Sequence, residues 1–476
     1  MIRALIFAGL LPLLAAASPW ANVDKETARR MVRLARDAEK TEQKAARREI
    51  LTRVIELQPE NSPARTGLLY SKDKESGEWV RKLDDRVAVM NWEDADPAEG
   101  AKLLEDLHEL ECWRSRRYVR LWLKKSESKR DREVLEALLL RTPREASVHE
   151  ALGHPKMGGL FVRPELAPLV RGRKTIVARW RACRKKEIEA TPAEELFPVA
   201  GVPNDLATVG ADGQEFVSTF GEDETVRIAV EARRSYAFVA QLLGAKAEPW
   251  APYRFCLLDS IGYRRMIYAL HDDPEEQGSR LKFSSYEHED YLALQADTVD
   301  KAFDTVSHTI AYKTMQLSIA PGEGDERDSE PYAFMKEGFG YLVSLEMYGT
   351  ATTWFHSGTE SAQKVTSLSP PPEVKNTATL TKWLQKNARS GQLLTMPQVF
   401  GRSLNNLDFL ASIQAWSFLK FLALKDPAAF RNFPLFLREK EEGSWPDRVA
   451  ESLKQSFDLP VKDLERQWRA WLLEIE

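Results

Sequence analysis

The pattern of apolar residues predicts an amphipathic helix over residues 297–319. Apolar side chains recur there at steps of three, four and seven residues, which places them on one stripe that faces a core. They are Val299, Phe303, Val306, Ile310 and Leu317. A neighbouring stripe carries His308, Tyr312 and Met315 at positions i, i+4 and i+7. These three side chains are therefore reachable from one side of the helix.

A second helix is predicted after the acidic segment 322–330. It follows Pro331, and one face carries Phe334, Glu337, Tyr341 and Leu345. Residues three and four apart are neighbours on a helix surface, so this face is continuous. We expect the two helices to pack together with His308 and Glu337 facing each other.

Three strands are predicted upstream of the first helix, at residues 215–220, 253–259 and 291–294. Helices at 224–243 and 263–271 separate them. We expect the strands to share one sheet that packs against the helix carrying His308. Residues 407–472 read as a succession of helices. The predicted fold class is therefore α+β and mostly helical, with a small sheet and a C-terminal helical lobe.

The N-terminal part of the chain is predicted to be helical over residues 25–57, with a strand at 86–92, and it repeats one sequence pattern. A helix ends at Pro59 in one copy and at Pro143 in the other. The further matches are Leu68 with Leu152, Tyr70 with His154, and Trp79-Val80-Arg81 with Phe161-Val162-Arg163. We interpret these matches as a degenerate internal duplication whose copies adopt equivalent conformations.

His149 and His154 fall inside the second copy. We expect a structural role for them rather than metal binding, because the matching residues Arg65 and Tyr70 are not metal ligands. Two copies are fewer than a free-standing solenoid needs, so the duplicated parts must pack against something else.

Changes in composition divide the chain into parts. The pattern weakens over residues 171–214, where a basic helix at 179–186 gives way to recurring proline and glycine, and we interpret this region as a linker into the last domain. The expected organisation is a signal peptide at 1–17, a helical module with the duplication at 18–170, the linker, and a last domain at 215–476.

The start of the chain has the form of a secretory signal peptide. Met1-Ile2-Arg3 is followed by an apolar run that ends in small residues near Ala17. The run is too short for a comfortable membrane span, and no cysteine follows it, so no stable membrane anchor is expected. A buried N-terminal helix is the alternative. We expect export to the periplasm or the medium, from a bacterial cell.

The net charge and the spacing of the cysteines bear on nucleic-acid binding, metal binding and disulfide formation. A formal net charge of -4 over 476 residues gives no global field that attracts nucleic acid. The basic and aromatic residues at 113–125 are therefore interpreted as a solvated helix face, and no nucleic-acid partner is expected. Cys112, Cys183 and Cys256 have no metal spacing. Either one pair forms a disulfide or all three are buried thiols, and the sequence does not choose.

The helix pair resembles the active-site core of thermolysin-like zinc peptidases, the gluzincins with a peptidase-MA fold. In that family one helix carries His-Glu-x-x-His, and a second carries a glutamate in a Glu-Gly-Phe/Leu-Ala-Glu-Tyr type phrase. The histidines and the second glutamate hold zinc, and the first glutamate activates water. Here the phrases read His308-Thr-Ile-Ala-Tyr312 and Glu337-Gly-Phe-Gly-Tyr341. The resemblance covers residues 215–476, and the phrase around Pro59 resembles a boundary between tetratricopeptide-type repeats.

The resemblance implies that His308 and Glu337 are the remaining metal residues. The general-base position holds Thr309, the second-histidine position holds Tyr312, and the position of the acid expected one turn after the third ligand holds Tyr341. We expect this site to be vestigial, with zinc bound weakly or not at all, because two protein ligands are too few. His288-Glu289 also lacks a second histidine and is interpreted as a polar turn.

The sequence leaves three alternative functions open. The first is an exported metallopeptidase-like protein that has lost catalysis and binds a protein or peptide partner or acts as a scaffold. The second is an active zinc peptidase with a rearranged ligand set that adds a carboxylate such as Asp304. The third is a helical-repeat interaction protein without a metal site. The sequence names no substrate, partner or oligomeric state.

Overall fold

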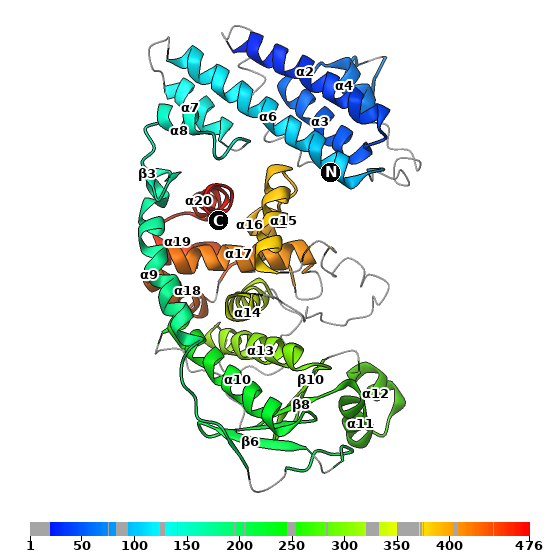
Figure 1. The fold of residues 1–476 in the computed structure, drawn as a ribbon, viewed down its shortest axis with the longest axis vertical. Helices are drawn as coiled ribbons and strands as arrows, with labels where there is room; N and C mark the ends of the chain where they lie inside the picture. Colours follow the sequence, from blue (N-terminus) through cyan, green and yellow to red (C-terminus); the bar gives the residue numbers. More distant parts are fainter. Residues whose placement is uncertain are drawn as a thin grey trace. The chain divides into compact units, whose positions relative to one another are not determined.

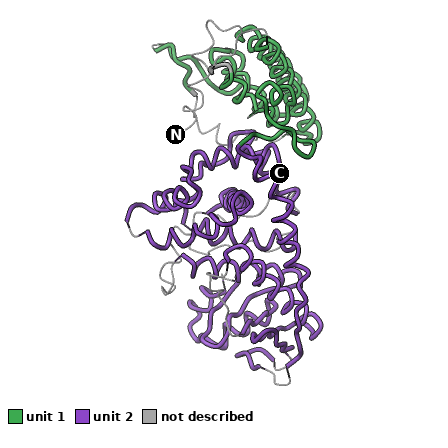
Figure 2. Tube along the Cα trace, turned by 90° about the vertical axis from the view of Figure 1, so that its left-hand side faces the viewer, with its two compact units in different colours: residues 1–164 green, residues 165–476 purple. Residues whose placement is uncertain are grey.

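The computed structural model describes most of the chain as two compact units, residues 1–164 and 165–476 (Figure 2). The described residues are 20–74, 76–81, 94–123, 129–139, 141–193, 197–203, 206–244, 254–281, 284–319, 333–349, 371, 374, 376–403, 407–440 and 442–476. The expected signal peptide, the strand expected at 86–92 and the acidic segment 322–330 lie outside them. No described helix is long and apolar enough to cross a membrane.

Unit 1 is built mainly from helices. The region predicted as helical at 25–57 forms α2 (Ala21–Lys40) and α3 (Lys44–Leu57), which pack against each other and against α6 (Pro97–Trp122). Between α2 and α3 the chain turns at Glu42, whose φ is 58°. These two helices bury apolar side chains at Met31, Ala35, Ile50 and Val54. The helix α7 (Lys129–Leu138) completes the helical part.

Both copies of the repeated phrase fold as a short helix followed by an antiparallel hairpin. The first copy consists of α4 (Ser62–Gly67), β1 (Tyr70–Lys72) and β2 (Trp79–Arg81), and the second of α8 (Ala146–Ala151), β3 (Lys156–Met157) and β4 (Leu160–Phe161). The turn residues correspond as well. Leu69 and Gly153 have φ values of 67° and 70°, and Gly77 and Gly159 have 70° and 89°. The two phrases therefore have equivalent local conformations, as predicted.

Unit 2 contains a mixed sheet with the strand order β5-β6-β7-β8-β10-β9. Its strands are β5 (Thr191–Pro192), β6 (Ala207–Ala211), β7 (Gln214–Ser218), β8 (Arg254–Leu258), β9 (Ser285–Glu287) and β10 (Leu292–Gln295). β8 is parallel to both β7 and β10, and the outer pairs are antiparallel. The three predicted strands are thus neighbours in one sheet, as expected.

Residues 171–214, interpreted from the sequence as a linker, are part of unit 2. The helix α9 (Ala167–Cys183) occupies the first part of this region, after a short 3-10 turn at Pro164–Leu166, and β5 and β6 add to the sheet. The proline and glycine residues that suggested a linker include turns beside short strands, such as Gly201 and Gly213, whose φ values are 70° and 79°. α9 buries Trp180, and its exposed residues include Arg171, Lys174, Arg179 and Arg181.

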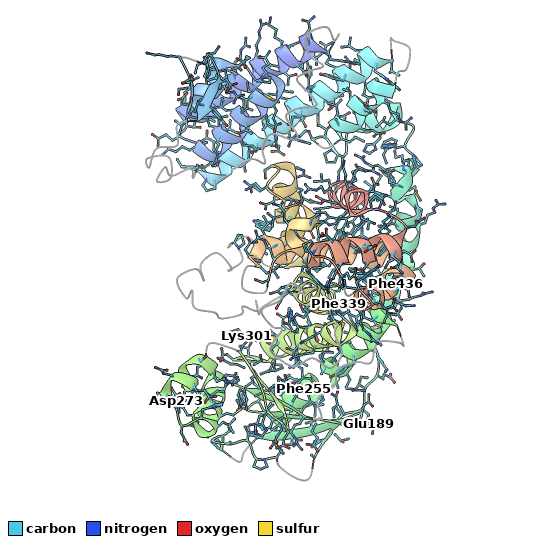
Figure 3. The ribbon with its side chains drawn as sticks, turned by 180° about the vertical axis from the view of Figure 1, so that it is seen from behind. Glu189, Phe255, Asp273, Lys301, Phe339 and Phe436 are labelled. Atoms are coloured by element: carbon cyan, nitrogen blue, oxygen red, sulfur yellow. The ribbon has the colours of Figure 1, made fainter. Side chains whose placement is uncertain are left out.

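Two long helices lie at the centre of unit 2. They are α13 (Val299–Ile319) and α14 (Ala333–Tyr348), and α13 also packs against α10 (Glu222–Leu243) and β10. Figure 1 shows the sheet, α13, α14 and α17 (Phe409–Lys425) in succession. In Figure 3 the labelled Phe255 of β8 and Phe339 of α14 lie on either side of α13. The remaining helices are α11 (Ser260–Leu270), α12 (Pro274–Arg280), α15 (Thr377–Arg389), α16 (Met396–Phe400), α18 (Pro427–Arg438), α19 (Trp445–Phe457) and α20 (Val461–Glu474).

The single apolar stripe predicted for α13 is too narrow. Every residue from 304 to 311 is buried, because helices and a strand enclose this part of α13. Leu317, by contrast, was assigned to the core and is 36% exposed near the end of the helix.

The three cysteines are free thiols. Cys112 and Cys256 are buried, and burial raises the pKa of the Cys112 thiol to about 12. A thiol with so high a pKa is a poor nucleophile at neutral pH.

Candidate functional site

The packing of α13 against α14 brings His308 and Glu337 together. Nε2 of His308 lies 3.2 Å from a carboxylate oxygen of Glu337, and their side chains are 3% and 6% exposed. The two residues are 29 positions apart in the sequence (337 − 308), with His308 in the middle of α13 and Glu337 in the second turn of α14. The pair is therefore a buried contact that joins the two central helices.

Two tyrosines and a lysine surround this pair. The ring of Tyr341 meets the His308 ring edge-to-face, with 4.7 Å between centroids, and the Tyr312 ring lies 6.3 Å away and nearly parallel. The Lys336 ammonium, in a side chain that is almost fully buried, lies 5.0 Å from the centre of the Tyr312 ring. This is a cation–π arrangement. The sequence analysis named both tyrosines but missed Lys336.

Glycines in α14 allow this close packing. A Cβ added to Gly340 would lie 2.5 Å from Cε1 of His308 and 2.6 Å from its Nε2, so the imidazole rests directly on the helix backbone. α14 also packs closely against α17, because a Cβ added to Gly338 would lie 2.8 Å from Cβ of Ala415 in α17. α14 thus has little room to move away from either neighbour. The phrase Glu337-Gly-Phe-Gly in the sequence indicates this close packing. Glycine destabilises the interior of a helix, so two glycines there suggest that neighbouring groups approach the helix backbone closely.

Other polar groups near the site form hydrogen bonds within α13 or between α13 and α14. The Thr309 hydroxyl donates a hydrogen bond to the Thr305 carbonyl at 2.7 Å. The hydroxyls of Ser307 and Tyr348 are 3.0 Å apart and join α13 to the end of α14. Burial raises the pKa of Tyr348, so its phenol stays protonated at neutral pH. Asp304 is buried one turn before His308 on α13.

These residues do not fit a resident zinc ion. Two ligands of one tetrahedral zinc ion lie about 3.4 Å apart when each bond is about 2.1 Å, so the 3.2 Å between His308 and Glu337 is compatible with shared coordination. However, structural and catalytic sites supply at least three protein ligands. Tyr312 takes the position expected for the second imidazole, and the Lys336 ammonium over its ring adds a positive charge that repels a dication.

A second group of potential ligands occurs at His288, Glu289 and Asp290, whose ligand atoms lie within 4.8 Å of one another. The segment is a bend between β9 and β10, as expected for a polar turn. The His288 ring stacks on Tyr291 with 4.6 Å between centroids, and its Nδ1 accepts a hydrogen bond from the Asp290 amide. This geometry accounts for the three residues as turn and packing elements.

Comparisons with known proteins assign neither a family nor a relative. No protein-family model, curated protein or solved structure matches this chain.

Proposed function

We propose that unit 2 is a peptidase-like domain without hydrolytic activity, which acts as a binding or scaffold domain for a protein or peptide partner. The observation that carries the proposal is the buried contact between His308 and Glu337, closed on one side by the Gly340 backbone and flanked by two tyrosines. A hydrolytic site needs a base beside an open metal position. The order of strands and helices before α13 supports the family resemblance. The residues at the base and second-histidine positions, Thr309 and Tyr312, argue against catalysis.

The position after His308 also supports the loss of catalysis. Thr309 has a hydroxyl that is bonded to its own helix and is a far weaker base than a carboxylate. Hydrolysis would require another group to accept the proton of the attacking water. We therefore expect no peptidase activity from the chain as it stands.

A zinc titration tests this proposal. We expect the unmodified protein to bind zinc no more tightly than about 1 μM, since loss of outer-shell partners alone weakens metal sites about tenfold or more. The double variant Thr309→Glu/Tyr312→His restores the base and the second imidazole, and it should bind zinc at least about tenfold more tightly. The variant Thr309→Gln/Tyr312→Phe is the matched control, because it changes the same positions without adding a ligand or a carboxylate.

Two other functions make different predictions. An active peptidase with a rearranged ligand set is favoured by the 3.2 Å spacing and by the buried Asp304. It predicts stoichiometric zinc and peptide cleavage in the unmodified protein, both abolished by His308→Ala. An interaction protein without a metal site is favoured by the equivalent phrases of unit 1. It predicts that even Thr309→Glu/Tyr312→His binds no zinc.

A further inference from the structure

The repeated phrases of unit 1 use the same contact with different side chains. In the first copy, Nε of Arg65 donates a hydrogen bond to the Pro59 carbonyl at 2.8 Å. In the second copy, Nε2 of His149 makes the corresponding bond to the Pro143 carbonyl, also at 2.8 Å. Each of these side chains then meets the next matched residue, which is Tyr70 in the first copy and His154 in the second.

The hydrogen bonds of the second copy determine where the protons are. A carbonyl can only accept, so Nε2 of His149 carries a proton. In a neutral imidazole the other nitrogen is then bare, so Nδ1 of His149 accepts. Nδ1 of His154 lies 2.8 Å away and must donate. One proton therefore bridges the two rings. A proton added at Nε2 of His154 leaves this bridge intact, and two N–H groups are set against each other only when His149 also carries a second proton.

The surroundings oppose that second proton. His149 is 1% exposed and His154 is 8% exposed. Burial lowers the pKa of His149 below its ordinary value of 6.5, and Arg163 lowers it further, while the bond to Pro143 and the charge of Glu145 act the other way. Glu145 is itself paired with Arg116 of α6 at 3.2 Å. The other nearby cations are Arg132 of α7, which donates to the Leu152 carbonyl, and Lys156, which lies over the Phe161 ring.

The corresponding contact in the first copy is not sensitive to pH in this range. The Arg65 guanidinium lies 4.8 Å from the centre of the Tyr70 ring, and both side chains are partly exposed. Neither arginine nor tyrosine ordinarily changes its charge between pH 5 and 8. The two copies of the phrase have the same backbone conformation, but only in the second copy can the central side-chain contact gain a proton between pH 5 and 8.

We propose that the contact between His149 and His154 is an acid-sensitive switch, in which protonation of both rings releases the hairpin β3–β4 while the equivalent hairpin β1–β2 stays closed. His149 connects the parts that would separate. It bonds the loop at Pro143, and its ring stacks on Phe161 of β4 with 5.6 Å between centroids. Loss of the bridging hydrogen bond removes one of the contacts that hold α8 to the segment leading into the hairpin, and the stacking of His149 on Phe161 then remains.

The direction of the pH effect follows from linkage. The open form binds the proton with the ordinary affinity, and the closed form binds it more weakly, so closure is complete above pH 6.5 and is lost progressively below it. For one histidine that is protonated only in the open form, the opening equilibrium rises about 30-fold between pH 7.5 and 5.0.

Hydrogen–deuterium exchange of the full chain, corrected for the intrinsic pH dependence of exchange, tests the proposal. Peptides that cover α8 and β3–β4 should open about 30-fold more at pH 5.0 than at pH 7.5. Peptides that cover α4 and β1 should change much less. An equal response of both copies, or of neither, would overturn the proposal.

Exchanging the side chains between the copies provides matched variants. His149→Arg/His154→Tyr gives the second copy the residues of the first and should abolish its acid response. Arg65→His/Tyr70→His should give the first copy an acid response. If the first variant keeps its response, the proposal is wrong. Should that variant fail to fold, NMR titration of the His149 ring in the unmodified protein decides the question. A midpoint below pH 6.5 supports the proposal, and a midpoint at or above 6.5 contradicts it.

Discussion

His308 and His149 are both almost completely buried, at 2% and 1% exposure, but their partners lie at very different distances along the chain. His308 meets Glu337, Gly340 and Tyr341 on another helix. The His149 side chain forms hydrogen bonds to groups five and six residues away, and its ring stacks on Phe161, twelve residues away. The first environment therefore depends on how two helices pack, and the second on how one short segment of the chain folds. The variants below test whether the two histidines differ in this way.

Gly340→Ala should have the largest effect. The added methyl group would overlap the His308 ring at 2.5 Å, and the contact of Gly338 with α17 prevents α14 from moving away. We expect a loss of about 3 kcal/mol in the free energy of unfolding of unit 2, measured by urea denaturation.

Gly278→Ala is the control for this variant. Gly278 lies in α12 with no heavy atom within 4 Å of an added Cβ. Alanine should therefore be neutral there, or stabilising by up to about 1 kcal/mol. Equal effects of the two substitutions would show that the His308 ring does not rest on α14.

His149→Ala should have the next largest effect. It leaves the buried Pro143 carbonyl without its donor, which costs about 2 kcal/mol in the stability of unit 1. Arg65→Ala removes the matching bond from Pro59, which is partly exposed, so water can replace the donor and the cost should be about 0.5 kcal/mol. Urea unfolding monitored by exchange in unit 1 peptides measures both, and a larger loss for Arg65→Ala would reverse the ranking.

Gly153→Ala should have a smaller effect than His149→Ala. An added Cβ meets no atom within 4 Å, so only the φ of 70° opposes it, at about 1 kcal/mol or slightly more. Leu69 adopts a φ of 67° at the matching position, so a side chain is tolerated in this turn. A loss of several kcal/mol would mean that the two turns are not equivalent, and the same unfolding measurement detects it.

Local sequence signals determined much of the secondary structure. The three central strands, the two helices predicted between them and the matched phrases around Pro59 and Pro143 lie where the sequence predicts them, within a few residues, whereas α12 was not predicted. These features depend on side-chain periodicity and on turn residues that act over short stretches. The equivalent bonds of Arg65 and His149 to the two prolines are local in the same sense.

The tertiary structure alone decided the surroundings of His308. The sequence predicted that His308 and Glu337 would face each other, but not that Lys336 would lie over the Tyr312 ring or that the imidazole would rest on Gly340. It also predicted a linker where α9, β5 and β6 join unit 2. Burial of a helix on all sides and contacts between distant residues depend on the packing of several elements at once. Periodicity reports which side of a helix is apolar, but it does not report which atoms of other elements that side will meet.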